Sequence, residues 1–299
     1  MTSLKPVSLA LFVLLLGQCQ SNPKTPIKNI LLITLDTTRA DVLGIYGNKN
    51  IQTPNLDHLA LNGNFFSQCF SHAPITLPSH TSILTGLNPL HHGVHNNINY
   101  ALPDTTPTLA TLLKEKGYRT GAFVSSFILD SRFGLSRGFD LYEDNIVHYK
   151  KQRDQKEILT RRAGDTIHHL EDWLSQSDAQ QPFFAWLHLY DAHAPYEAPL
   201  PFRQAYASSP YFGEVAYVDY ELGRLFEFLD AQGLDKETLI IVTADHGDSF
   251  EEHGEATHGF FCYSTTTHVP LILSKPLFGS PGKNFQHRVQ SADIFPTVL

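Results

Sequence analysis

The stretch Ile30-Leu-Leu-Ile-Thr-Leu-Asp36 sets the expected fold, because it is a short apolar run that ends directly at an acid. A strand that is apolar on both faces is typical of a parallel sheet covered by helices. Further runs of this kind follow at residues 121–125, 183–189, 239–243 and 269–273. We therefore expect these segments to form the strands of a central, mostly parallel sheet.

Helical patterns lie between these apolar runs. Thr53-Pro54 and Thr106-Pro107 each place a capping residue before a proline, which predicts a helix start, and Gly117 is expected to close the second helix. Longer amphipathic patterns cover residues 158–174 and 215–229, and the charged residues 144–157 predict a surface excursion. Strands that alternate with helices predict an α/β fold of three layers, α/β/α.

The composition limits the class of partner. The chain has 299 residues, of which 42% are hydrophobic and 17% are charged, as is ordinary for a globular protein. Its net charge of -8 argues against a nucleic-acid partner, because phosphate contacts need clustered Lys and Arg. The 16 histidines stand out, since histidine binds metals and transfers protons near neutral pH.

The first residues predict a secretory signal. Lys5 precedes an apolar run over residues 7–16 that is too short to span a bilayer. We expect a signal peptide over 1–19, a polar linker over 20–28 and one catalytic domain over 29–299. Because the chain stops inside the apolar pattern of residues 293–299, we expect this domain to be truncated at its C-terminus.

The cysteines bear on location and on cross-linking. Cys19 directly follows the apolar run, so acylation of Cys19 and anchoring to a membrane are expected, although Gln18 stands where a small residue is usual. The predicted location is therefore periplasmic or envelope-anchored. Cys69 and Cys262 allow either one disulfide or two buried thiols.

Three of the apolar runs lead into acids, namely Asp36, Asp191 with nearby His193, and Asp245 with His246. Ligands of open parallel sheets bind beyond the carboxyl ends of the strands, so these side chains should meet at one edge. A single aspartate there is commonly a turn or cap residue, but three together are hard to explain in that way. Asp36, Asp245 and His246 suit a divalent metal, with zinc or manganese favoured by the imidazole and calcium as a further option.

The segment Thr76-Leu-Pro-Ser-His-Thr-Ser-Ile-Leu-Thr-Gly86 is the second candidate element. Pro78 and Ser79 predict the entry to a short helix, with Thr76 just before it. The positive end of that helix would face an anion bound near Thr76. A metal bound to the Thr76 hydroxyl would lower its pKa and make it a nucleophile, whereas the simpler interpretation is that Thr76 only caps the helix.

This segment resembles the sulfatase signature, in which Cys or Ser is followed by x-Pro-Ser-Arg and later by Thr-Gly. Further matches occur in the order that the family uses: Asp36, Thr53-Pro-Asn-Leu-Asp57, Gly117-Tyr118, His193-Ala-Pro195 and Asp245-His-Gly247. The chain is thus identified as a member of the sulfatase-like branch of the alkaline phosphatase superfamily. Its Thr-Leu-Pro-Ser-His version also resembles a bacterial envelope subgroup, and residues 245–249 with His258-Gly259 are similar to lipid phosphoethanolamine transferases.

The departures from the family pattern change the expected chemistry. Typical sulfatases oxidise a Cys or Ser to formylglycine, but Thr76 carries a methyl group on its β-carbon and gives no such aldehyde. His80 stands where the signature has Arg, and Thr37 replaces the second Asp of an Asp-Asp pair. The Lys and His that follow Gly-Tyr-x-Thr-Gly in arylsulfatases fall at Ser125 and Phe127. A threonine hydroxyl beside a metal favours phosphate esters, whereas the family favours sulfate esters.

The resemblance and the motif order imply roles for the site residues. The metal ligands are expected to be Asp36, Asp245 and His246, with Thr76 as a further ligand and the nucleophile. The remaining catalytic candidates are His193 and His258, for the ester oxygens or the leaving group, and His80, one helical turn from Thr76. Asp191 is either a supporting acid or part of a second metal site with His193 and His258.

The sequence as a whole predicts a metal-dependent hydrolase of sulfate or phosphate esters. The expected substrate is a small-molecule, glycan or lipid-headgroup ester. Two alternatives stay open: a phosphoethanolamine-type transferase that works through a covalent Thr76 intermediate, and a non-catalytic envelope binding lipoprotein. Transferases of that kind usually carry several membrane spans, and a relic would not need to keep the hydroxyl and the metal ligands, so the hydrolase is favoured.

Overall fold

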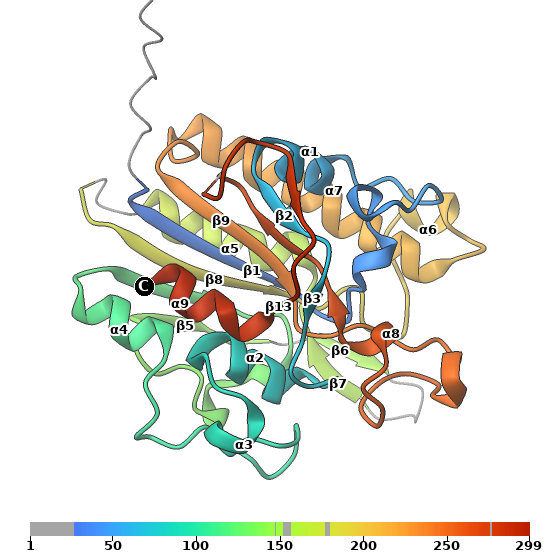
Figure 1. Ribbon diagram of the computed structural model, residues 1–299, viewed down its shortest axis with the longest axis horizontal. Coiled ribbons are helices and arrows are strands. Elements are labelled where there is room, and N and C mark those ends of the chain that lie inside the picture. Colours follow the sequence, from blue (N-terminus) through green and yellow to red (C-terminus); the bar gives the residue numbers. More distant parts are fainter. Residues whose placement is uncertain (1–26, 147, 152–156, 177–179, 276) are drawn as a thin grey trace, which may run out of the picture.

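The computed structural model describes residues 27–146, 148–151, 157–176, 180–275 and 277–299 (Figure 1). The expected signal peptide and Cys19 lie outside these residues. No helix of the described part is long and apolar enough to cross a membrane.

The central sheet of the described residues has eight strands in the order β12-β2-β11-β9-β1-β8-β4-β5. β1 lies in the middle, parallel to both β8 and β9, and every residue of these three strands is buried. The prediction of a mostly parallel sheet is therefore confirmed. The strands of this sheet are β1 (Asn29–Leu35), β2 (Asn64–Phe66), β4 (Arg119–Phe123), β5 (Leu141–Glu143), β8 (Phe183–Leu189), β9 (Thr238–Ala244), β11 (Leu271–Leu273) and β12 (Lys283–Phe285).

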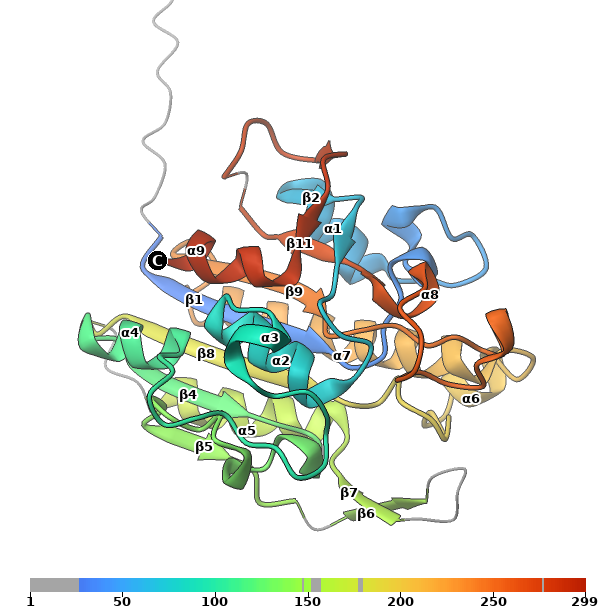
Figure 2. The ribbon, with the colours of Figure 1, turned by 60° about the horizontal axis from the view of Figure 1, so that its bottom comes forward.

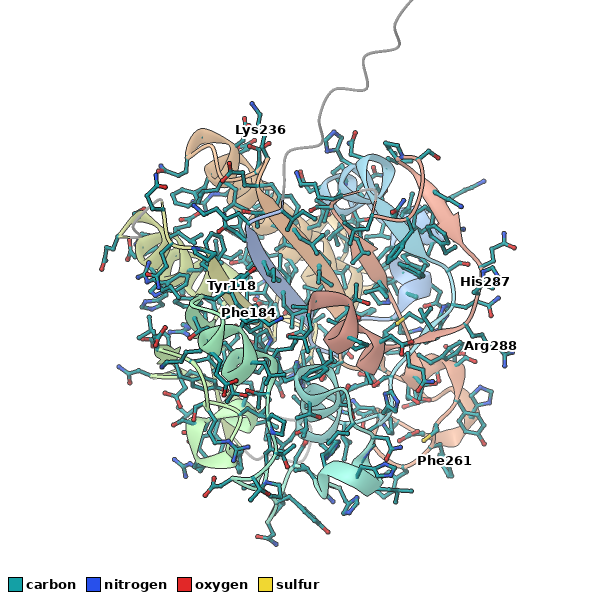
Figure 3. The ribbon with its side chains drawn as sticks, turned by 60° about the vertical axis from the view of Figure 1, so that its left-hand side comes forward. Tyr118, Phe184, Lys236, Phe261, His287 and Arg288 are labelled. Atoms are coloured by element: carbon teal, nitrogen blue, oxygen red, sulfur yellow. The ribbon has the colours of Figure 1, made fainter. Side chains whose placement is uncertain are left out.

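Helices cover both faces of the sheet, which makes the expected three layers (Figure 2). One face carries α1 (Pro54–Asn62), α5 (Ala163–Ser175) and α7 (Pro210–Ala231), and the other carries α2 (Thr76–Thr85), α4 (Leu109–Glu115) and α9 (Ile294–Val298). Phe184 of β8 points into this interior, whereas Lys236 and Arg288 project from the surface (Figure 3). The short helices α3 (Pro89–His92), α6 (Phe202–Ala205) and α8 (Ser264–Thr267) lie in the connections.

Two of the expected helix starts are wrong. α4 is capped by Thr108 rather than Thr106, because the Thr108 and Thr111 side chains form a reciprocal capping box with each other's backbone N–H groups. The pattern at 158–174 begins with a strand instead of a helix: β7 (Glu157–Thr160) pairs with β6 (His148–Lys151), and α5 starts at Ala163.

The apolar run at 269–273 is also divided. Pro270 separates β10 (His268–Val269) from β11, since proline offers no N–H to a sheet ladder. β11 runs antiparallel to β9 in the main sheet. β10 instead joins β3 (Cys69–Phe70) and β13 (Val289–Gln290) in a small separate sheet. Cys69 in β3 is a buried free thiol and Cys262 an exposed one, so the two do not form a disulfide.

The start of α1 is fixed by an acid from α7. The carboxylate of Asp219, which is buried, accepts hydrogen bonds from the backbone N–H groups of Asn55 at 3.2 Å and Leu56 at 2.8 Å. A carboxylate at these unpaired N–H groups also interacts favourably with the helix dipole. Asp219 thereby joins α1 and α7, two of the three helices that cover one face of the sheet.

We expect Asp219→Ala to lower the free energy of unfolding by about 1–3 kcal/mol, because it leaves buried N–H groups of α1 without an acceptor. Urea denaturation of the purified chain measures this. Asp230→Ala, at an exposed position on the same helix, is the matched control and should stay near the wild-type value. Equal stability of Asp219→Ala and the wild type would contradict the capping role.

Candidate functional site

The ends of β1 and β9 bring the expected metal ligands together. Asp36 directly follows β1, and Asp245 and His246 directly follow β9. One ligand atom from each of the three lies within 4.8 Å of the others, and all three side chains are buried. Because β1 and β9 are parallel neighbours, their carboxyl ends place these residues side by side.

The hydrogen bonds of His246 indicate where a cation fits. Its Nδ1 lies 2.9 Å from the carbonyl oxygen of Gly247, so Nδ1 carries the proton and Nε2 presents a lone pair. That lone pair faces Asp245 Oδ2 at 3.2 Å, and this oxygen receives no hydrogen bond from the described residues. Two buried acceptors this close repel each other unless a positive charge lies between them. The donor set therefore fits a divalent metal.

The buried carboxylates of Asp36 and Asp245 also favour a cation at this position. Burial raises the pKa of Asp245 well above its ordinary value, and the neighbouring charge of Asp36 raises it further. Burial likewise lowers the pKa of His246, which keeps its ring neutral and able to bind a metal.

Thr76 is the first residue of α2 rather than the residue before it, and its side chain reaches the cluster. Thr76 Oγ1 lies 3.4 Å from His246 Nε2. Ser79, one turn later, donates from Oγ to the carbonyl oxygen of Asp245 at 2.5 Å. Every residue of α2 is buried, so the helix that carries the hydroxyl is held firmly against the sheet edge.

The backbone of the first turn of α2 is also engaged. Leu77 N donates to the side-chain oxygen of Asn97 at 2.8 Å. Asn97 is a residue that the sequence did not single out, because it lies in a polar loop after α3 without any recognisable spacing.

His80 lies behind Thr76 and makes a chain of buried hydrogen bonds. Its Nδ1 is 2.8 Å from the carbonyl oxygen of Thr76, so Nδ1 carries the proton and donates it. Trp186 Nε1 donates to Thr34 Oγ1 at 3.0 Å, which leaves the Thr34 hydroxyl proton for His80 Nε2 at 3.1 Å. Burial lowers the pKa of His80 well below its ordinary value, which agrees with a neutral ring. Both ring nitrogens are thus engaged within the protein, and His80 is placed to position Thr76.

His188 holds Asp36 in a similar way. Ser125 N donates to His188 Nδ1 at 3.3 Å, so Nε2 carries the proton and donates to Asp36 Oδ2 at 3.2 Å. Burial lowers the pKa of His188 to about 3. As a single histidine within an apolar run, His188 carries no sequence signal that marks it as a site residue. His188 lies on β8 directly opposite Thr34 of β1, and this position points to the site only once the strand register is known.

The turn after β1 carries an unusual backbone. Thr37 has φ +49°, a left-handed conformation that is rare for a β-branched residue. Its N–H donates to Asp245 Oδ1 at 3.2 Å and its carbonyl accepts from the Tyr211 hydroxyl at 2.9 Å. These bonds hold the strained residue between the two carboxylates. Gly247 is required nearby, since a β-carbon there would collide with the carbonyl oxygen of Thr265.

His258 and His193 extend the site away from Thr76. The His258 ring centroid lies 4.4 Å from that of His246 and 5.2 Å from that of His193, which in turn stacks on Tyr190. Burial lowers the pKa of His258, and its Nδ1 lies 4.0 Å from Asp248 Oδ1. His246, His258 and His193 thus form a row of neighbouring rings that leads away from Asp36 and Asp245.

The side chain of Asp191 contacts Arg162 and lies outside the group of Asp36, Asp245 and His246. Its Oδ1 lies 3.3 Å from Arg162 Nη1, and the same nitrogen lies 3.1 Å from Glu214 Oε2. Asp191 therefore has a cationic side chain as its partner, and it does not belong to the group of ligand atoms around Asp36 and Asp245.

Known proteins resemble this chain along most of its length. The sequence model of the family described as Sulfatase matches residues 28–299. An arylsulfatase of Clostridium perfringens is 22% identical, over 91% of this chain and 74% of the relative. An N-acetylgalactosamine-6-sulfatase of Canis lupus familiaris is 27% identical, over 93% and 62%. The chain thus spans less than two thirds of the canine protein.

Solved structures share the fold. A phosphonate monoester hydrolase of Agrobacterium radiobacter superposes with a TM-score of 0.76 at 22% identity, over 91% of this chain and 73% of that one. A second solved protein, in complex with its substrate D-glucosamine-2-N,6-O-disulfate, superposes with a TM-score of 0.75 at 21% identity. The match covers 91% of this chain and 76% of that one. The expected α/β architecture is therefore confirmed by comparison as well.

We expect His80→Leu to lower kcat by about 100-fold with little change in KM, because the carbonyl of Thr76 loses the donor that fixes the hydroxyl. His80→Asn, whose amide nitrogen can replace Nδ1, should restore most of kcat. The assay uses 4-nitrophenyl sulfate and 4-nitrophenyl phosphate. Equal losses in the two variants would show that His80 does not position Thr76 through Nδ1.

Proposed function

Because the chain belongs to the sulfatase family, we propose that it is a metal-dependent hydrolase of sulfate or phosphate esters with Thr76 as the nucleophile. The observation that carries the proposal is the 3.4 Å approach of Thr76 Oγ1 to His246 Nε2, next to a buried cluster of cation ligands. The candidate substrates are a small molecule, a glycan or a lipid headgroup that carries such an ester.

Asp36, Asp245 and His246 would hold the metal, with the Thr76 hydroxyl as a further ligand. When bound, a zinc, manganese or calcium ion would lower the pKa of that hydroxyl and neutralise charge on the ester oxygens. The mutual repulsion of Asp245 Oδ2 and His246 Nε2 supports this assignment. The choice between these ions rests on the imidazole ligand, which favours zinc or manganese.

The chain's own groups divide the remaining work. The Thr76 hydroxyl would lose its proton to solvent once the bound metal has lowered its pKa, and Oγ would attack the sulfur or phosphorus atom, form a covalent ester with it and release the alcohol. Water would then hydrolyse that ester and return the hydroxyl of Thr76. The N-terminus of α2 favours the negative charge of the group being transferred. His258 and His193 are assigned to the ester oxygens and to protonation of the leaving alkoxide, since an anion bound beside them raises their proton affinity.

The identity of residue 76 separates this chain from formylglycine chemistry. The threonine β-carbon carries a methyl group, so the side chain keeps its hydroxyl and must attack directly. The names of the relatives favour sulfate esters, whereas direct attack by a hydroxyl favours phosphate esters, so both classes stay in the proposal. The transferase and the binding lipoprotein gain no support, because the compared proteins named here are sulfatases or a hydrolase.

Export is part of the proposal. The apolar run 7–16 and Cys19 support a secretory signal with acylation at that cysteine. Such an anchor would place the catalytic domain at a membrane surface.

We expect Asp245→Asn to reduce the bound metal from about one ion per chain to nearly none, because a neutral amide is a poor ligand in this buried cluster. Inductively coupled plasma mass spectrometry of dialysed protein measures the ratio. Asp172→Asn, at an exposed acid, is the matched control. Full metal content in Asp245→Asn would remove Asp245 from the ligand set.

We expect Thr76→Ala to lower kcat by at least about 1,000-fold on the better of 4-nitrophenyl sulfate and 4-nitrophenyl phosphate, because the nucleophile is gone. Thr76→Ser keeps the hydroxyl and should retain most of the rate. The assays contain added zinc or manganese. Full activity of Thr76→Ala would show that another group or water attacks the ester.

A further inference from the structure

An aromatic cavity adjoins the candidate site and has no part in the chemistry above. It encloses about 250 Å³ and is lined by Tyr196, Ser209, Pro210, Tyr211, Phe212 and Phe250. Its walls come from three separate segments: the loop after β8, the start of α7 and the loop after β9. The loops after β8 and β9 are the ones that carry His193, Asp245 and His246.

Two of the walls are bonded directly to the site. The Tyr211 hydroxyl donates to the carbonyl oxygen of Thr37, the residue next to Asp36, at 2.9 Å. The Tyr196 hydroxyl donates to Asp248 Oδ2 at 3.0 Å, and the other oxygen of Asp248 lies 4.0 Å from His258 Nδ1. The cavity is therefore fixed in place by the same groups that shape the reaction centre.

These bonds also determine what the cavity offers to a ligand. Both phenol hydroxyls are engaged, since Tyr211 additionally accepts from Arg39 N at 3.1 Å. The rings pack closely, with centroids 4.7 Å apart for Tyr211 and Phe250 and 5.5 Å apart for Tyr196 and Tyr211. The walls thus present mainly ring faces and edges, which favour contact with another flat, apolar surface.

The loop after β9 holds Phe250 in a strained backbone. Phe250 has φ +51° and Glu251 has φ +65°, left-handed conformations that are unfavourable for residues other than glycine. Arg39 ties this loop down through bonds from Nη1 to the Asp248 carbonyl at 3.3 Å and to Glu252 Oε1 at 2.7 Å. Strain that is maintained by surrounding contacts is characteristic of ligand-binding segments.

We propose that this cavity is the subsite for the alcohol part of the ester, and that it takes a single ring with an apolar face. Its volume is below the range of about 300–1,000 Å³ that is usual for drug-sized ligands, so it has room for a single ring. An aryl ring and the apolar face of a pyranose share this chemistry. The inference rests on the proposed function, because it assumes that the ester group lies at Thr76.

Calorimetric titration of the Thr76→Ala chain in the presence of zinc tests the subsite without turnover. The two ligands are 4-nitrophenyl sulfate and inorganic sulfate, which has no alcohol part. Adding Phe212→Ala should weaken binding of the aryl sulfate by about 3- to 10-fold and leave inorganic sulfate unchanged. Phe212 is the first choice because, unlike Tyr196 and Tyr211, it has no hydroxyl that bonds to residues of the site. Phe250→Ala is the second variant and should have the same selective effect.

Tyr220→Ala provides the control, since Tyr220 is an exposed aromatic on α7 outside the cavity lining and should bind both ligands as before. N-acetylgalactosamine 6-sulfate replaces the aryl ester in a second arm and distinguishes a pyranose from an aryl preference. Equal weakening of both ligands by Phe212→Ala, or no weakening of any ring-bearing ligand, overturns the proposal. If neither inorganic sulfate nor inorganic phosphate binds, the proposed function fails. The cavity is then judged from 4-nitrophenol, whose binding Phe212→Ala must weaken.

Discussion

The site depends on one electrostatic constraint: two buried carboxylates and an imidazole lone pair share a space that excludes water. Asp245 Oδ2 and His246 Nε2 are both acceptors, 3.2 Å apart, and Asp36 adds a second negative charge. Burial of such groups is expensive unless a cation compensates them. The parallel strands β1 and β9 impose this arrangement, since the acids are the first residues beyond their carboxyl ends. The fold thereby brings together, from two short segments, a group of ligand atoms that fits a divalent metal.

Neutral histidines maintain the geometry around that charge. His80 and His188 are held in opposite tautomers: one donates from Nδ1 to the carbonyl of Thr76, the other from Nε2 to Asp36. Their rings lie 4.9 Å apart and both are buried, so neither adds a positive charge beside the metal ligands. Where a typical sulfatase signature has Arg, this chain relies on a hydrogen-bond chain anchored in β1 and β8. The proposed metal would then supply the positive charge of the site.

Much of this architecture could be predicted from local sequence patterns, whereas the rest depends on how segments distant in the sequence pair with one another. The buried strands β1, β8 and β9 and the convergence of Asp36, Asp245 and His246 follow from apolar runs that end at acids. The start of α4 depends on Thr108, although Thr106-Pro107 has the same capping pattern. The separation of β10 from β11 depends on Pro270, which lies inside a continuous apolar run. His188, Asn97 and the pairing of Asp191 with Arg162 could not be predicted, because these contacts join segments far apart in the chain. The aromatic cavity likewise forms only when two loops and the start of α7 come together.

The proposed mechanism requires that Thr76 Oγ1 forms a covalent bond to the transferred group. Rapid-quench peptide mass spectrometry tests it most directly, with the metal-loaded chain mixed with 4-nitrophenyl sulfate or 4-nitrophenyl phosphate. We expect a transient sulfuryl or phosphoryl group on the peptide that contains Thr76, located on that residue by fragmentation. Turnover with no modified Thr76 at any quench time, or with the group on another residue, would contradict it.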